Sequence, residues 1–275
     1  MKRLWNVPVI LLAAIICSCS TIEEDRDICP CWYTIDFTEV DRSVQNLHLW
    51  IYDENGKLLC RDSLENGAYG RYDVKLERGK AYCYVWGNFS DSTIIFGEPL
   101  KDAYFIKADS CSSDPLFHYS KVLQTGAEWG CDTVMLQKEF AILDFTLKGK
   151  LEYKEQLQIE IVQSVCGRYV YGGFVEGKSH IYAYHQHLDD DSSQFRLRMM
   201  RQSSLDGIVA IITALDGDER VVIREFPLGE WLDALGYDMN AKNLADIVVE
   251  LDLAIGDVSI MVDNWQVVLP GKIEI

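Results

Sequence analysis

Apolar and polar residues alternate along most of this chain, and that alternation limits the possible folds more than any other feature. Every second residue of 31–37 is apolar or aromatic, and the same pattern returns at 47–52. A period of two places successive side chains on opposite faces of a strand, so both segments are expected to be half-buried strands. Asp53-Glu54-Asn55-Gly56 then supplies the positive-φ positions of a hairpin turn into a partner strand at 57–60.

Similar segments recur through the rest of the chain, separated by clusters of glycine, asparagine and aspartate. Further strands are expected at 72–76, 81–86, 133–136, 140–147, 157–161, 168–175, 180–184, 208–215, 220–225, 246–254 and 258–269. The one short amphipathic pattern, at 228–235 before Gly236, predicts a single helix. Many short strands at close spacing predict an all-β fold built from antiparallel sandwiches, with little helix.

The chain divides into two β-rich halves. An irregular stretch at 109–130, rich in Ser, Asp, Pro and Gly, is expected to be a long loop with one apolar pair, Leu116-Phe117. A new apolar run begins after Gln137, and 275 residues are enough for two domains. We therefore predict one sandwich domain at 28–137 and a second at 138–275.

The first residues have the pattern of an export signal. Lys2 and Arg3 precede an apolar run at 4–16 that is too short to span a bilayer as a permanent helix. The formal net charge of −17 becomes −19 without these two cations. So acidic a chain is not expected to bind nucleic acid or to adsorb to anionic head groups without a covalent anchor.

The apolar run ends in Cys17-Ser18-Cys19, which resembles the lipobox of bacterial lipoproteins. That resemblance implies that a cysteine thiol is acylated with palmitate-type chains and becomes the first mature residue. Cys19 is the stronger candidate because it follows the small Ser18, whereas Cys17 follows the β-branched Ile16. Lipidation at Cys17 and an ordinary secretion signal are the alternatives. The prediction is a signal peptide at 1–18 and an acidic tether at 19–27.

Seven cysteines follow the signal, and an exported protein can oxidise them to disulfides. The odd number leaves at least one thiol unpaired, and the sequence does not determine the pairing. The candidates are Cys29, Cys31, Cys60, Cys83, Cys111, Cys131 and Cys166.

Two clusters of polar residues are candidate chemical sites. His180, His185 and His187 with Asp189, Asp190 and Asp191 have ligand chemistry, but they are interpreted more simply as a polar loop tip. Asp36, Glu39 and Asp41 could supply the two carboxyl groups that a glycosidase needs, but an acidic surface offers many such pairs by chance. The sequence also contains no nucleophile elbow, phosphate loop, zinc-protease helix or dinucleotide fingerprint. We predict no catalytic residue, no metal and no cofactor.

A cluster of aromatic residues could stack on sugars or could belong to the core. The cluster comprises Tyr82, Tyr84, Trp86 and Phe89. Core packing on one face with cross-strand pairing on the other is the favoured interpretation.

Several segments, taken in order, resemble the anchor branch of the fimbrillin family, the proteins of type V fimbriae. They are the Asp27-Ile28-Cys29-Pro30 start, LHLWIYDENGKLL at 47–59, YCYVWGN at 82–88, DPLFHY at 114–119 and VDNWQVV at 262–268. The positions that weigh most are Gly56, Trp86-Gly87-Asn88 and Trp265.

This resemblance implies two transthyretin-like sandwiches, a lipid anchor in the outer membrane, and a non-enzymatic role at the base of a fimbria. The implied partners are fimbrial shaft or accessory subunits, joined by strand addition at an open sheet edge. Shaft subunits of the family are cut after a basic residue, but a cut after Arg26 would here detach the lipid, so Arg26 is expected to stay uncut. The alternative function is a surface lipoprotein that binds a glycan or a protein and does not polymerise.

Overall fold

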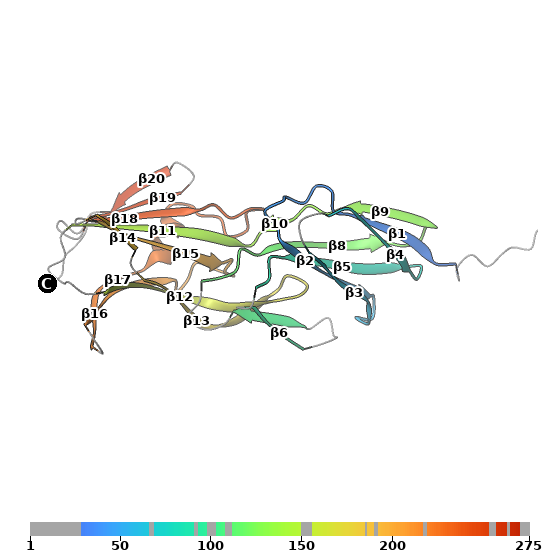
Figure 1. Cartoon of the computed structure of the whole chain (residues 1–275), viewed down its shortest axis with the longest axis horizontal. Coiled ribbons are helices and arrows are strands. Elements are labelled where there is room, and N and C mark those ends of the chain that lie inside the picture. The colour runs from blue at the N-terminus through green and yellow to red at the C-terminus, as the bar shows by residue number, and fades with distance from the viewer. Residues whose placement is uncertain are drawn as a thin grey trace, which may run out of the picture.

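The computed structural model describes residues 29–65, 69–90, 93–97, 103–107, 112–149, 156–184, 186–189, 192–216, 219–252, 257–262 and 265–269. Nearly all of them lie in or between β-strands (Figure 1). The elements are β1 (Cys31–Asp36), β2 (Asn46–Asp53), β3 (Leu58–Glu65), β4 (Arg71–Leu76), β5 (Lys80–Gly87), β6 (Thr93–Phe96), β7 (Tyr104–Lys107), β8 (Phe117–Gln124), β9 (Trp129–Thr133), β10 (Gln137–Lys138), β11 (Phe140–Lys148), β12 (Gln156–Tyr169), β13 (Phe174–Tyr184), β14 (Gln186–Asp189), β15 (Ser192–Met200), β16 (Val209–Asp216), β17 (Glu219–Phe226), α2 (Leu228–Ala234), β18 (Ile247–Asp252), β19 (Val258–Val262) and β20 (Trp265–Leu269). The predicted all-β, two-sandwich fold class is confirmed.

The N-terminal sandwich packs a sheet of order β4-β1-β9 against a sheet of order β10-β8-β5-β2-β3. Leu47, Leu49 and Ile51 alternate along β2 and are fully buried between the sheets, as the period-two pattern predicts. Cys83 and Val85 of the adjacent β5 fill the same core. Burying an aliphatic side chain of this size contributes about 1.5–3 kcal/mol relative to leaving it in water.

The C-terminal sandwich has a sheet of order β14-β15-β11-β18-β19-β20 and a sheet of order β17-β16-β12-β7-β6, with β13 also paired to β12. Leu143, Phe145 and Leu147 of β11 project into its core. Leu228 and Leu232 of α2 join the same core. The helix expected at 228–235 is confirmed, and Gly236 ends it with a φ of +71°.

The two sandwiches repeat one strand plan. The order β4-β1-β9 in the first corresponds to β15-β11-β18 in the second, and β8-β5-β2-β3 corresponds to β17-β16-β12-β13. Each copy contains one parallel pair, β1 with β9 and β11 with β18. In each copy the last strand, β9 or β18, follows a strand of the opposite sheet. It can therefore pair in parallel with the first strand, β1 or β11. The sequence pattern led us to expect antiparallel neighbours throughout, and these two pairs are the exception.

Four local expectations differ from the structure. The strand expected at 168–175 is instead the turn between β12, which ends at Tyr169, and β13, which begins at Phe174. The stretch 109–130 is not one loop, because β8 occupies Phe117–Gln124 and β9 begins at Trp129. The segment 258–269 is not one strand but the antiparallel pair β19 and β20. The strand expected at 133–136 is shifted, since β9 ends at Thr133. At 168–175 and 258–269 the pattern located apolar segments but missed the turn, and at 109–130 the Ser, Asp, Pro and Gly content concealed β8.

A hairpin from the first half of the chain pairs with a strand of the second half. The strands β6 and β7 lie between β5 and β8 in sequence, yet β7 pairs with residues 167–169 at the end of β12. Gly167 permits this contact, because a Cβ there would lie 2.1 Å from the carbonyl oxygen of Phe105. The division of the chain at residue 138 stays a prediction, and these sheets interlock across it.

The described chain is elongated, with the sandwiches arranged end to end (Figure 1). The strands β1, β4 and β9 lie toward one end, and β16, β18 and β20 lie toward the other. No helix among the described residues has the length and apolar character needed to cross a membrane. We call the end where β1 begins, near Cys29, the tether end.

Candidate functional site at the junction of the two sandwiches

An aromatic cluster fills the contact between the two sandwiches. Trp86 of β5 is fully buried and meets Phe105 of β7 edge to face, with ring centroids 4.7 Å apart. Phe89 also packs on Phe105, at 4.8 Å. The indole Nε1 of Trp86 donates a 2.8 Å hydrogen bond to the carbonyl oxygen of Val170, just beyond β12. One side chain thus bonds the N-terminal sandwich to the C-terminal one.

This geometry decides between the two interpretations of the aromatic residues at 82–89, core packing and sugar stacking. Trp86 and Phe89 are buried in the junction, so the favoured core interpretation is confirmed for them and a sugar-binding role for these two rings is wrong. Tyr82 and Tyr84 are half-buried on the same face. The β6–β7 hairpin, which sequence reasoning missed, covers the junction side of this face.

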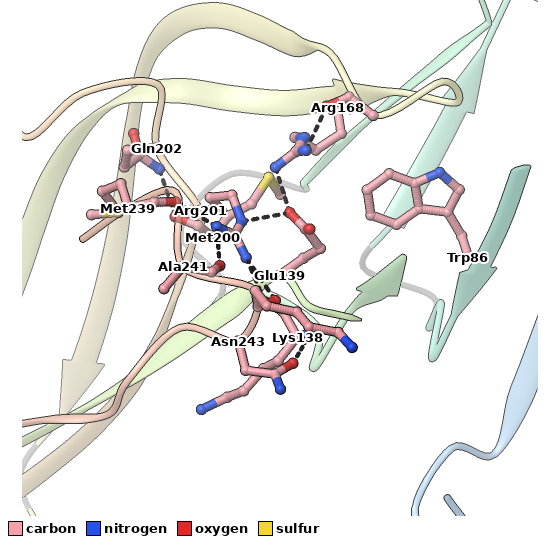
Figure 2. Close-up of polar contacts among 12 residues, drawn as sticks. Trp86, Lys138, Glu139, Arg168, Met200, Arg201, Gln202, Met239, Ala241 and Asn243 are labelled. Atoms are coloured by element: carbon pink, nitrogen blue, oxygen red, sulfur yellow. Dashed lines mark hydrogen bonds and ion pairs between the residues drawn. The ribbon is translucent and has the colours of Figure 1, made fainter. Parts of the chain in front are cut away.

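A buried ion-pair network ties the linker, the segment between β10 and β11, to the C-terminal sandwich (Figure 2). Glu139 lies between β10 and β11, and its Oε2 accepts from Arg168 Nη1 at 2.7 Å and from Arg201 Nε at 2.9 Å. All three side chains are buried. Burial lowers the pKa of Arg168, and the Glu139 carboxylate opposes that shift. A buried charge needs such compensation, because an unpaired one costs several kcal/mol.

The remaining guanidinium donors are used by backbone carbonyls of several segments. Arg201 Nη1 donates to Ala241 at 2.8 Å and also to Met239, while its Nη2 donates to Lys138 at 3.0 Å. Arg168 Nη2 donates to Gly172 at 2.5 Å. The linker, the end of β15 and the segment before β18 are therefore held by one group of bonds.

The ring of His118 completes the junction beside Trp86. The two rings stack with centroids 4.2 Å apart. Burial, with smaller contributions from the charges of Arg168 and Arg201, lowers the pKa of His118 to about 3. The imidazole is therefore neutral at neutral pH, and its Nε2 has no hydrogen-bond partner among the described atoms.

This arrangement is suited to holding two bodies in one orientation. Sequence reasoning did not identify Glu139, Arg168 or Arg201 as functional residues. The sequence does carry one sign of such residues, a charged residue directly adjacent to an apolar run. Glu139 precedes Phe140 in this way, and Arg201 follows Met200. Such a residue is expected either at a strand end or in a buried pair.

Two of the three candidate glycosidase carboxylates accept hydrogen bonds from residues of their own loop. Asp36 accepts from the Thr38 amide at 2.9 Å and from its hydroxyl at 2.7 Å, and these bonds lower the pKa of Asp36. Asp41 accepts from the Ser43 amide at 2.7 Å. Glu39 is exposed. The structure thus gives Asp36 and Asp41 local structural partners.

His180, from the candidate metal cluster, bonds to a carboxylate instead. Its Nδ1 lies 2.5 Å from Oε1 of Glu160, whose Oε2 accepts from Arg220 at 2.5 Å. Burial would raise the pKa of Glu160, but the bonds from His180 and Arg220 outweigh it and keep that pKa below its usual value. His185, Asp190, Asp191 and the side chains of His187 and Asp189 lie outside the described part. Within the described residues, no three candidate ligands lie close enough to hold a metal ion.

The structure describes six of the seven cysteines proposed to form disulfides and neither of the two lipidation candidates. Among the described residues, Cys29, Cys31, Cys60, Cys83 and Cys131 form no disulfide, and the Sγ of Cys166 donates to the carbonyl oxygen of Val175 at 3.4 Å. Cys111 and the lipidation candidates Cys17 and Cys19 lie outside the described residues. Disulfide pairing and lipidation therefore stay predictions.

Comparison with known proteins gives a consistent assignment. The sequence model of the family described as "Fimbrillin-A associated anchor proteins Mfa1 and Mfa2" matches residues 29–270. No curated protein matches the chain.

Solved structures share the fold at low sequence identity. A Bacteroides thetaiotaomicron protein proposed to bind polysaccharide has a TM-score of 0.68 at 17% identity, with 87% of this chain and 98% of that chain covered. The fimbrial anchor protein Mfa2 from Porphyromonas gingivalis has a TM-score of 0.63 at 13% identity, with 86% and 99% covered. A proposed adhesin from Bacteroides ovatus has a TM-score of 0.63 at 15% identity, with 89% and 97% covered.

Replacing the shared carboxylate should destabilise the protein strongly. Glu139→Gln leaves two buried guanidinium groups without a counter-charge, so the free energy of unfolding should fall by about 3–5 kcal/mol. The matched control is Glu250→Gln, which breaks the exposed pair with Lys148 and should cost at most about 1 kcal/mol. Urea denaturation followed by circular dichroism measures both. Equal losses in the two variants would contradict a special role for the buried network.

His118 should make the stability depend on pH. The unfolded chain takes up a proton on this residue below its ordinary pKa of about 6.5, whereas the folded chain does not until about pH 3. As the pH is lowered through that window, the free energy of unfolding should therefore decrease by up to about 1.4 kcal/mol per pH unit. His118→Phe keeps the ring stack and should remove this component. If urea denaturation between pH 7 and 4.5 gives parallel losses for both proteins, the assignment is wrong.

Proposed function

Because the chain belongs to the family of fimbrillin-A-associated anchor proteins, we propose that it is the lipid-anchored base of a fimbria. Its task is mechanical: to hold a filament to the outer membrane of the cell. The observation that carries this proposal is the family match over residues 29–270, to which the end-to-end build with a bonded junction adds physical support. A filament pulls on its anchor, and a junction fixed by buried ion pairs and aromatic packing resists bending under that pull.

The proposed lipid lies on Cys19, with Cys17 as the alternative. Cys29 follows Cys19 by ten positions, so the tether reaches at most about 33 Å from the tether end. Each acyl methylene contributes about 0.8 kcal/mol in the bilayer, so several chains together hold firmly. Lipid at one end of the elongated chain leaves the opposite end for the filament.

We propose that the filament subunit joins by strand addition at β17. This strand lies at the edge of its sheet, so one row of backbone donors and acceptors faces away from β16. Val221 and Val222 are adjacent yet 45% and 56% exposed, and the register of β17 on β16 shifts directly after them. The charged residues of β17, which are Glu219, Arg220, Arg224 and Glu225, flank this uncharged pair, and the edge strands β3 and β4 also carry charged residues. An added strand would cover the two valines.

The proposed role is not enzymatic. Asp36 and Asp41 serve local turns, and Glu160 is held by His180 and Arg220.

A second candidate function is glycan binding by a surface lipoprotein. Four aromatic rings form a row across β6, β7 and the end of β12, with neighbouring centroids 5.4, 5.9 and 5.1 Å apart. The row consists of Phe96, Tyr104, Tyr169 and Tyr171. Its two end residues are exposed, and aromatic faces stack on sugars. Similarity to the Bacteroides thetaiotaomicron protein favours this candidate, and the strand-addition experiment below separates it from the anchor.

Cys19→Ser should release the protein from the membrane. Without an acylated cysteine no covalent anchor holds this acidic chain at a bilayer, so the protein and its filaments should move to the culture medium. Cys17→Ser is the matched control and should leave both on the cell. Cell fractionation and mass spectrometry of the mature N-terminus provide the measurements. A mature form that begins at Asp27, or release by Cys17→Ser alone, would overturn the assignment to Cys19.

Charges at the β17 edge should block assembly. Val221→Lys with Val222→Lys places two ammonium groups where an added strand must lie, so filament subunits should no longer co-purify with the anchor in heat-resistant oligomers. Met135→Lys changes a 53% exposed apolar residue outside the strands and should leave assembly intact. If β17 is not the acceptor edge, both variants will assemble alike. A wild-type protein that stays monomeric among filament subunits but binds immobilised glycan would favour the second candidate.

A further inference from the structure

Two tryptophans are exposed on the outer face of the first sheet. Trp32 of β1 is 45% exposed and Trp129 of β9 is 68% exposed. Their rings stack with centroids 6.3 Å apart and an interplanar angle of 23°. The Nζ of Lys75, on β4, lies 5.7 Å from the centroid of the Trp32 ring. The strand registers place Lys75, Trp32 and Trp129 in one row across the sheet, which we call the tryptophan row.

The tryptophan row lies where the chain enters the sandwich. Arg78 Nε donates to the carbonyl oxygen of Cys29 at 2.8 Å, and its Nη1 donates to Gly126 at 3.4 Å. The amide of Trp32 donates to Glu128 at 2.9 Å. These bonds fix the start of the described chain beside the loop that precedes Trp129. The proposed lipid on Cys19 is only ten residues away, within about 33 Å.

We propose that the tryptophan row is a membrane-docking surface that seats the tether end on the phospholipid head groups around the lipid anchor. This inference rests on the proposed lipidation. Indole rings favour the boundary between head groups and acyl chains, because they combine a large apolar face with one N–H donor. The Lys75 ammonium is a donor suited to a lipid phosphate.

The charges around the row specify the kind of membrane surface. Glu128 is exposed next to Trp129, and Asp73, one row further, accepts from Thr34 at 2.6 Å. One lysine among these carboxylates does not make a basic patch, and the whole chain carries a net charge of −17. Zwitterionic phospholipids therefore fit this surface better than strongly anionic ones, which the net charge repels.

Docking would give the anchor a second point of attachment. The covalent tether keeps the tryptophan row close to the bilayer, so even a weak contact is populated through its high effective concentration. A chain held by lipid alone can swing about its tether. One that also rests on the tryptophan row has a preferred orientation, with the C-terminal sandwich directed away from the membrane.

The test uses acylated full-length protein bound to phosphatidylcholine vesicles whose lipids carry bromine near the head group. Bromine quenches tryptophans that lie in the interface. We expect the quenched part of the emission to fall at least twofold in the double variant Trp32→Phe and Trp129→Phe. The matched control is Trp231→Phe, which changes a half-buried ring packed on the core of the other sandwich and should leave quenching unchanged.

The outcomes separate this inference from the proposed function. Vesicle-bound wild-type protein without quenching, or quenching that survives in the double variant, overturns the docking surface and leaves the lipid anchor standing. Protection of Trp32 and Trp129 by a soluble oligosaccharide in place of lipid quenching would make the row a sugar site and also overturn it. Failure of the wild-type protein to stay with the vesicles would refute the lipid anchor and the docking surface together.

Discussion

The carboxylate of Glu139 is the interaction on which the arrangement of this molecule depends. It lies between β10 and β11, where the chain passes from one sandwich to the next, and it accepts bonds from Arg168 and Arg201. Buried ion pairs add little net stability compared with apolar packing, but they penalise any arrangement that separates their members. Here the members come from the linker, β12 and the end of β15. The network therefore fixes the linker on the C-terminal sandwich, and the bond from Arg201 to the carbonyl oxygen of Lys138 extends this hold to β10, which pairs with β8 of the N-terminal sandwich.

Aromatic packing adds the stability that the ion pairs do not provide. Trp86, Phe89 and Phe105 come from both sides of the junction and are almost fully buried. The β6–β7 hairpin carries Phe105 across to β12, so the sandwiches share a sheet as well as a linker. A pull along the molecule is therefore opposed by backbone hydrogen bonds and apolar burial together. This construction is consistent with an anchor that must transmit tension without unfolding.

The sequence predicted local structure well and long-range structure poorly. Alternation located β2, β5 and β11, because in each of them every second side chain enters a core. It could not predict that β7 would leave its neighbours and pair with β12, since that pairing depends on a glycine at 167 and on no local pattern. The ion-pair site was missed for the same reason. Glu139, Arg168 and Arg201 lie 29 and 62 residues apart along the chain, measured from Glu139, and single-residue charge says nothing about which partner will be near. The sequence did not predict that Trp32 and Trp129 would be exposed. Alternation assigns side chains to two faces of a strand, but it does not indicate which face a second sheet will cover.

The repeated strand plan shows how two copies of one fold can serve different ends of an anchor. In the N-terminal copy, the edge strand β8 pairs through His118 and Phe117 with β10, where the chain leaves for the second sandwich. In the C-terminal copy, the corresponding strand β17 has no described strand beyond it and exposes Val221 and Val222. The same edge position is therefore used internally in one copy and stays open in the other. If the open edge accepts a filament strand, the first sandwich already contains the geometry of that contact, because β10 occupies the equivalent place on β8. The two copies then differ only in the strand that pairs with this edge, β10 in the first and a filament strand in the second. The strand order is the same in both.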